Sequence, residues 1–102
     1  MTYKDKVTAI TKQFRQAVED KYSIIEMKLF GSFARGDYSK TSDIDLMIRL
    51  PEVDRNIEED LFNIAYDLEL EHDCVIDVIV LPQNLANKTM IYQNIQKEGI
   101  PI

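Results

Sequence analysis

The heptapeptide IDLMIRL (Ile44–Leu50) and the octapeptide CVIDVIVL (Cys74–Leu81) decide the fold of this chain. In the first, polar and apolar residues alternate up to Pro51, and the second is apolar except for Asp77 and ends at Pro82. Short segments that stop at a proline are typical of β-strands, because proline cannot donate a hydrogen bond to a sheet. We therefore expect two strands here, the second of them buried on at least one face.

A helical segment separates the two predicted strands. Its apolar residues recur at steps of three and four, as on one face of a helix; they are Ile57, Leu61, Ile64 and Leu68. Asn56, followed by Glu59 three residues later, is expected to begin the helix. A strand, a helix and a strand in this order form a βαβ unit, so the two strands should be parallel neighbours.

Working outward, the flanking segments predict two more helices and one more strand. An amphipathic pattern predicts a helix over about residues 2–21, and the short apolar segment Ile24–Phe30 predicts a strand. A last helix is expected to begin at Asn84 and to end at Gly99 in a left-handed conformation. The element order is therefore α-β-loop-β-α-β-α. This order predicts an α/β (α+β) fold, a small mixed sheet of about three strands with helices packed on it.

Length and charge limit the classes of protein to which this chain can belong. Its 102 residues fit a single domain spanning residues 1–102. With a net charge of −6, the chain lacks the basic face on which non-specific nucleic-acid binding depends, so no direct nucleic-acid partner is expected. No apolar run approaches the roughly 20 residues that cross a bilayer, and the start lacks an apolar signal core. These features and the lone Cys74 predict a cytoplasmic protein without a membrane partner.

Three aspartates interrupt the strand pattern. Successive side chains of a strand face opposite sides, so Asp43 and Asp45 share one face while Ile44 and Leu46 take the other. Asp77 likewise points away from its apolar neighbours. An Asp-x-Asp pair alone is more often solvated than catalytic, but an acid within an apolar strand costs stability unless it is paired or coordinated. If the two strands adjoin in register, three carboxylates meet.

Such a trio favours a divalent cation. Three neighbouring carboxylates repel one another, and a bound cation removes the conflict. Oxygen ligands suit Mg²⁺, with Mn²⁺ as an alternative, and two ions can clamp the attacking and leaving oxygens of a phosphoryl displacement. Zinc is disfavoured, since the chain has one histidine and one cysteine. We therefore expect Asp43, Asp45 and Asp77 to be metal ligands.

The segment before this trio adds a phosphate-binding signal. Gly31-Ser32-Phe33-Ala34-Arg35-Gly36 is followed by Asp43-Ile44-Asp45, with ten residues between Ser32 and Asp43. A Gly-Ser step lets backbone amides and a hydroxyl approach a phosphate closely. This arrangement resembles the nucleotidyltransferase superfamily that includes DNA polymerase β, and most closely its minimal nucleotidyltransferase (MNT) branch. Asp77 matches the third acid of that family's pattern.

The resemblance implies an activity and a partner. Minimal nucleotidyltransferases are commonly paired with a small helical protein of the HEPN class, often a ribonuclease toxin, for which they act as the antitoxin. The chain is then expected to be a Mg²⁺-dependent protein adenylyltransferase that transfers AMP from ATP to a tyrosine hydroxyl of its partner, within a hetero-oligomer. Asp43, Asp45 and Asp77 would be catalytic, while Gly31, Ser32, Arg35 and Gly36 would bind the nucleotide. Lys40 and Arg49 are further candidates for contacting its phosphates.

Two other functions stay open at this point. The chain could neutralise a partner by contact alone, with an idle nucleotide site. It could also transfer a nucleotide to a small molecule, although the roughly twenty residues after Leu81 leave little room for an acceptor domain. The apolar end Ile100-Pro101-Ile102 either packs on the domain or docks a partner.

Overall fold

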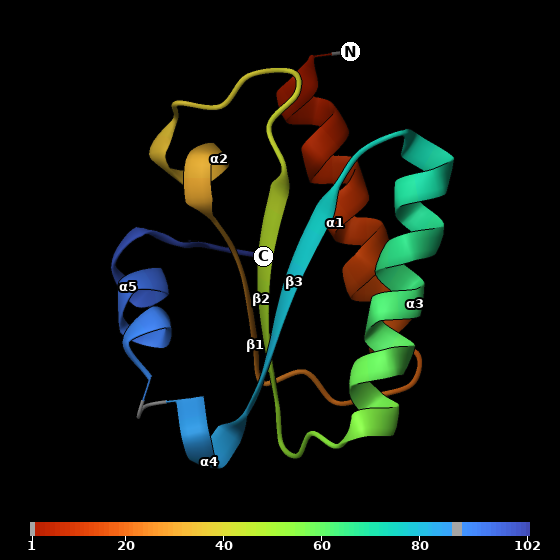
Figure 1. Cartoon of the computed structure of the whole chain (residues 1–102), viewed down its shortest axis with the longest axis vertical. Coiled ribbons are helices and arrows are strands. Elements are labelled where there is room, and N and C mark those ends of the chain that lie inside the picture. Colours follow the sequence, from red (N-terminus) through yellow and green to blue (C-terminus); the bar gives the residue numbers. More distant parts are fainter. Residues whose placement is uncertain (1, 87–88) are drawn as a thin grey trace.

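The computed structural model describes residues 2–86 and 89–102, which form a four-stranded mixed sheet with helices packed on it (Figure 1). The strands lie in the order β3-β2-β1-β4. Along the chain the elements are α1 (Tyr3–Glu19), β1 (Glu26–Phe30), α2 (Gly31–Arg35), β2 (Ile44–Leu50), α3 (Arg55–His72), β3 (Ile76–Pro82), α4 (Gln83–Ala86), α5 (Met90–Glu98) and β4 (Ile100–Pro101). The predicted fold class is confirmed, with one strand more than expected.

The βαβ unit forms as the strand pattern predicts. Strand β2 has the predicted bounds and pairs in parallel with β3, so that Asp45 lies opposite Asp77. Strand β1 pairs with β2 in the antiparallel direction, which makes the sheet mixed. The two strands of the unit begin at the same edge of the sheet, and the loops that precede them meet there.

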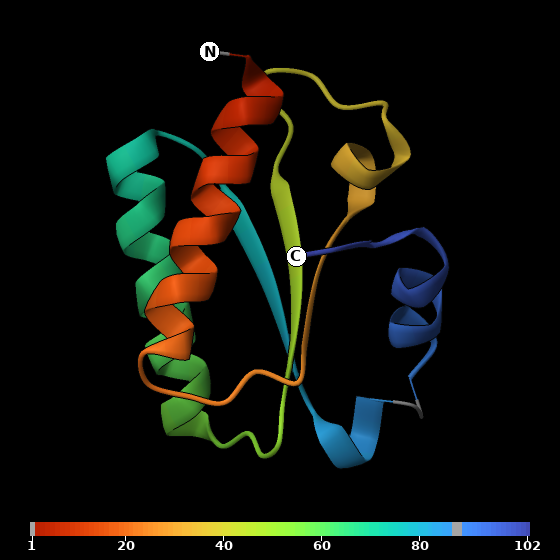
Figure 2. The same ribbon diagram turned by 180° about the vertical axis from the view of Figure 1, so that it is seen from behind.

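Each face of the sheet has its own apolar cluster. Ile44, Leu46 and Ile48 of β2 pack with α1 and α3, which lie side by side on one face (Figure 2). Met47 faces the other side, where it packs with Tyr92 and Ile95 of α5. Helix α5 therefore covers part of the face that carries Asp45. In the described residues, no helix combines the length and the apolar character needed to cross a bilayer.

The boundaries differ from the sequence-based expectation where a nearby side chain offers a better cap. Asp54 rather than Asn56 begins α3, because its carboxylate accepts a hydrogen bond from the Ile57 amide at 2.8 Å. Thr89 in place of Asn84 begins the last long helix, and Asn84 lies in the separate short helix α4.

The end of the chain forms a fourth strand that the sequence did not predict. Gly99 is extended, with φ −71° and ψ 150°, and not left-handed as expected. Because the chain continues in an extended conformation, Ile100 and Pro101 pair with β1, and the Ile102 amide donates to the Met27 carbonyl at 3.0 Å. The apolar end therefore packs on its own domain.

Candidate active site

The structure brings the three predicted acids together. Asp45 and Asp77 occupy the same register position of adjacent strands, which lie about 4.8 Å apart in a sheet. Asp43 comes one residue before β2, at the edge of the sheet where both strands begin. The Asp77 carboxyl group lies within hydrogen-bond reach of those of Asp43 and Asp45. Asp43 and Asp77 are exposed, whereas Asp45 is half-buried.

Burial and the neighbouring carboxylates raise the pKa values of two of these acids, Asp45 and Asp77. Partial burial, and then the neighbouring charges of Asp77 and Asp43, raise the pKa of Asp45 to about 6, and Arg35 opposes the rise. Burial, followed by the charge of Asp43, also raises the pKa of Asp77. A carboxylate that gains a positive partner shifts in the opposite direction. The described protein groups, Arg35 included, therefore compensate the negative charge of the trio only in part.

The backbone of Gly31 packs directly against the Asp45 carboxylate. Its φ is +71°, and a Cβ atom built on it would lie 2.1 Å from Oδ2 and 2.9 Å from Cγ of Asp45. Any side chain at this position would displace the carboxylate, in addition to the strain of a left-handed backbone. The backbone at the start of α2 consequently lies too close to the Asp45 carboxylate for any residue but glycine.

The other predicted nucleotide-binding residues belong to the short helix α2, which follows β1 directly. Gly36 ends this helix in the left-handed conformation, with φ 84°. Arg35 is exposed, with its Nε 3.3 Å from Asp37 Oδ2, and its positive charge reaches Asp45. The Ser32 hydroxyl is half-buried and has no hydrogen-bond partner in the described part of the chain. These groups surround the acids on the side of β1.

Arg49 does not belong to this site. It lies four residues beyond Asp45 in β2, which corresponds to about 13 Å along a strand. Its Nε is 3.8 Å from Glu26 Oε1, and its guanidinium lies over the Tyr92 ring at 5.4 Å from the centroid. The expectation that Arg49 contacts phosphate is wrong, because folding buries its charge against α5. Lys40 lines a hollow beside the acids.

Sequence reasoning missed Tyr3, which anchors the loop that carries Asp43. The Tyr3 hydroxyl donates to the Ser42 carbonyl at 2.6 Å. Its ring stacks on Tyr38, with centroids 5.5 Å apart, and Tyr38 stacks on Phe33 at 4.8 Å. Tyr38 thus contacts two other protein rings. No spacing in the sequence connects Tyr3 with a carbonyl 39 residues away.

The donor set fits a hard divalent cation. The trio offers carboxylate oxygens alone, the ligands that Mg²⁺ and Mn²⁺ prefer. Within residues 2–86 and 89–102, no group of three or more acidic, histidine or cysteine side chains has a ready-made metal-binding geometry. Asp43 and Asp77 are exposed, however, so their carboxylates can turn toward an ion, and a cation would relieve the conflict that raises the pKa of Asp45.

The sequence matches one protein family over most of its length. The model of the nucleotidyltransferase domain matches residues 11–102. A relative from Methanocaldococcus jannaschii, named "Putative protein adenylyltransferase", is 39% identical over 93 residues, a match that covers 86% of this chain and 89% of that protein.

Solved structures share the fold. A minimal nucleotidyltransferase superposes with a TM-score of 0.67 at 17% identity, covering 100% of this chain and 97% of the other. A toxin-antitoxin complex with AMP-PNP gives 0.66 at 19% identity, covering 88% and 69%. A complex of the tri-AMPylated HEPN toxin of Shewanella oneidensis with its MNT antitoxin gives 0.55 at 18% identity, covering 98% and 71%.

Proposed function

This chain belongs to the nucleotidyltransferase domain family, and from that premise we propose that it transfers AMP from Mg²⁺–ATP to a tyrosine hydroxyl of a HEPN-type helical protein, for which it is the antitoxin. Its relative's name supports a protein as the acceptor. The AMPylated toxin bound to the MNT antitoxin supports AMP transfer to a helical partner. The nucleotide analogue in a related complex supports an adenine nucleotide as the donor.

One observation carries the proposal: Asp45 and Asp77 share a register position, and Asp43 adjoins them. Asp43 and Asp45 would hold the cation that accompanies the ATP phosphates, and Asp77 would complete a second metal site. A bound pair of Mg²⁺ ions supplies charge neutralisation at the attacking and leaving oxygens of an in-line displacement. The exposed positions of Asp43 and Asp77 leave room for a substrate on the open side of the trio.

The remaining residues hold the nucleotide and move the proton. Gly31 and Ser32 would contact the β and γ phosphates through backbone and hydroxyl, Arg35 would neutralise their charge, and Gly36 would fix the end of α2. Asp77 accepts the proton of the tyrosine hydroxyl, whose oxygen then attacks the α phosphorus, and pyrophosphate leaves.

Removal of single carboxylates tests this function. The pure protein is incubated with α-³²P-ATP, Mg²⁺ and the helical protein that co-purifies with it, and label on the partner is quantified. Asp43→Asn and Asp77→Asn should each lower the transfer rate by about 10³-fold, because each removes a charge from the transition-state site. Asp67→Asn, at an exposed acid of α3, is the matched control and should transfer normally.

The same experiment distinguishes AMP transfer to the partner from the two alternative functions, neutralisation by contact alone and nucleotide transfer to a small molecule. A stable but unlabelled complex of the wild-type protein with its partner would identify a module that neutralises by contact. Label on an added aminoglycoside instead of the partner would identify a small-molecule acceptor. Undiminished transfer by Asp43→Asn or Asp77→Asn would contradict the proposed roles of these residues.

A further inference from the structure

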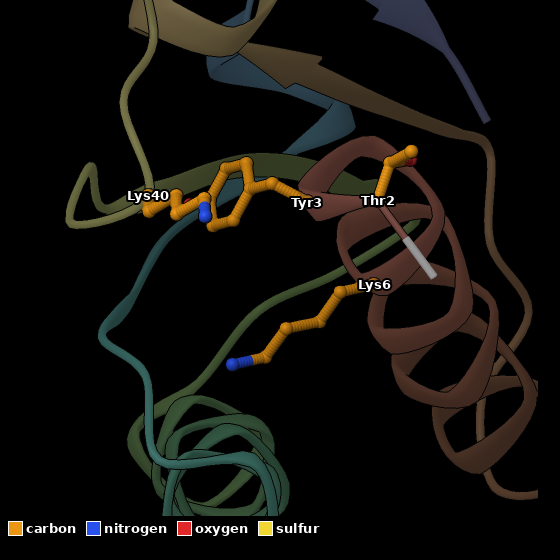
Figure 3. Close-up of a pocket in the computed structure, with 4 residues that line it drawn as sticks. All are labelled: Thr2, Tyr3, Lys6 and Lys40. Atoms are coloured by element: carbon orange, nitrogen blue, oxygen red, sulfur yellow. The ribbon is translucent and has the colours of Figure 1, made fainter.

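A hollow beside the carboxylate trio carries two positive charges that the proposed reaction has not used. Thr2, Tyr3, Lys6 and Lys40 line a space of about 340 Å³ (Figure 3). Tyr3, Lys6 and Lys40 also line an adjoining space of about 450 Å³ that reaches the loop before β3. These volumes fall within the roughly 300–1,000 Å³ of small-ligand pockets. The two spaces share three residues, and we treat them as one site, the Lys6–Lys40 hollow.

The hollow shares a wall with the proposed active site. Ser42, which precedes Asp43, and Val75, which precedes β3, both line it. A backbone hydrogen bond joins the start of β2 to the segment before β3, since the Ile44 amide donates to the Val75 carbonyl at 2.9 Å. The charges of Asp43 and Asp45 are also felt at the Tyr3 hydroxyl in the same wall. A ligand in the hollow would therefore lie next to the reacting groups.

The two ammonium groups are available to a ligand. Most other cations of the described chain are paired, for example Arg15 with Glu19 and Lys21 with Asp60. Within residues 2–86 and 89–102, the side-chain ammonium groups of Lys6 and Lys40 make no hydrogen bond and no ion pair. Figure 3 shows the Lys40 side chain beside the Tyr3 ring, while the Lys6 side chain extends from α1 across the opening with its ammonium group away from the ring. In a chain of net charge −6, two unpaired cations in one hollow favour an anion at this place.

Resting on the proposed function, we propose that the Lys6–Lys40 hollow is a second anion subsite, which binds a phosphate group next to the carboxylates. Lysine ammonium groups bind phosphate as point charges, and two of them match a group with two ionised oxygens. Asp73 is the one acid among the residues that line the two spaces, and it lies on the side toward β3. The phosphate belongs either to the triphosphate of the donor nucleotide or to an acceptor that already bears a phosphate.

Charge-removing variants test the subsite by binding alone. Inorganic phosphate is titrated into the full chain with Mg²⁺ present, and its affinity is measured by NMR. Lys6→Gln and Lys40→Gln should each weaken phosphate binding about threefold to tenfold. Lys12→Gln is the matched control, because it removes an equal charge from the same helix outside the hollow. Asp73→Asn should strengthen binding.

A second titration identifies the source of the phosphate. The protein is first saturated with Mg²⁺ and α,β-methylene ATP, which cannot donate AMP. If the hollow holds the donor triphosphate, the analogue blocks phosphate binding and the double variant K6Q/K40Q binds the analogue about tenfold or more weakly. If it holds an acceptor phosphate, phosphate still binds to the loaded protein and the double variant keeps its affinity for the analogue.

The proposal is overturned if the double variant binds both phosphate and the analogue as tightly as Lys12→Gln does. Thermal unfolding of each variant, followed by circular dichroism, excludes loss of fold as the cause of lost binding. Because these measurements need no catalysis, they can succeed even if the wild-type protein transfers no AMP. Conversely, transfer that depends on Asp77, together with unchanged binding in the double variant, removes the subsite and leaves the proposed function standing.

Discussion

The two ends of strand β2 place opposite charges on the same face of the sheet and treat them differently. At one end Asp45 lies beside Asp43 and Asp77, and its pKa rises to about 6, first through burial and then through these like charges. At the other end Arg49 lies 3.8 Å from Glu26 and over the ring of Tyr92. Helix α5 covers the Arg49 end through Met47 and leaves the acids accessible.

This difference separates a structural charge from a functional one. Glu26, the partner of Arg49, also accepts hydrogen bonds from the Tyr92 hydroxyl at 3.1 Å and from Gln96 at 3.0 Å. Glu26 is therefore satisfied within the chain, and Arg49 faces an opposite charge, although its buried Nε has no hydrogen-bond partner among the described residues. The Asp45 end retains a repulsion that the described protein groups do not relieve, which is the condition under which a protein recruits a cation.

After loss of a carboxylate, the largest effect is expected at Gly31, the first residue of α2, in comparison with Gly36 at the end of that helix. Both have positive φ, +71° for Gly31 and +84° for Gly36, so alanine strains the backbone at each. At Gly31 alone the new Cβ would also meet the Asp45 carboxylate at 2.1 Å. Gly31→Ala should therefore lower AMP transfer by about 10²-fold or more, because even a 1 Å displacement of a catalytic group can cost that much.

Gly36→Ala is the control for backbone strain, since nothing lies within 4 Å of its Cβ position. It should reduce the free energy of unfolding by about 1 kcal/mol and change transfer far less than Gly31→Ala does. Urea unfolding and the ³²P transfer assay measure the two effects. Equal transfer rates in the two variants would show that the contact between Gly31 and Asp45 is not needed for activity.

Removing the charge at the other end of β2 should affect stability more than activity. Arg49→Met keeps much of the apolar stem but leaves Glu26 without its cation and Tyr92 without its cation–π contact. We expect a loss of about 1–2 kcal/mol in the free energy of unfolding, with transfer within about threefold of the wild type.

Arg55→Met is the matched control for this variant, since Arg55 is 90% exposed and pairs with Glu59 within one helix. Its effect on the free energy of unfolding should stay within about 0.5 kcal/mol. A large loss of AMP transfer in Arg49→Met, with stability unchanged, would return Arg49 to the active site and remove the contrast between the two ends.

The smallest expected effect is a pH dependence of stability at the acidic end. Because the pKa of Asp45 is about 6 in the folded chain and 3.8 for an ordinary aspartate, the folded state binds the proton more tightly. The ionised group therefore destabilises the metal-free protein at pH 7, and this cost shrinks as the pH falls below about 6 and disappears only near the ordinary pKa of 3.8.

Asp45→Asn should consequently be the more stable protein at pH 7, by less than about 1 kcal/mol once solvent screening is considered. The gap should narrow as the pH is lowered from 7 to 5, as measured by urea unfolding of both proteins. Mg²⁺ at pH 7.5 should stabilise the wild type and not the variant, because it binds the folded trio. A gap that widens on acidification would mean that a positive partner holds Asp45 ionised.

Much of the fold follows from local patterns. The alternation in Ile44–Leu50 fixed the bounds and the buried face of β2, and the βαβ order predicted its parallel pairing with β3. The helix boundaries were less predictable, because competing caps stand close together: Asp54 begins α3 in place of Asn56. Strand β4 has two residues, too few for any periodicity to reveal.

Part of the candidate site could also be predicted, because it depends on local sequence patterns. The register of two strands placed Asp45 opposite Asp77, and the Gly31-Ser32 step indicated a close backbone approach. The anchoring by Tyr3 and the contribution of Lys6 to the hollow could not be foreseen. Both residues come from the first turns of α1, and only folding brings that helix against the loop before β2.

By itself, the sequence determined the strand periodicity, the acids that break it and the glycine that lets the chain pass beneath one of them, since all three depend on spacing along a few residues. Tertiary structure decided which charges are used. Arg35 and Arg49 are equally cationic in the sequence, yet Arg49 packs over Tyr92 of α5, whereas Arg35 stays exposed at the end of α5, 4.0 Å from Glu98, with its charge still reaching Asp45. The electrostatic role of a side chain depends on the distance and burial of partners from other elements, which local spacing does not encode.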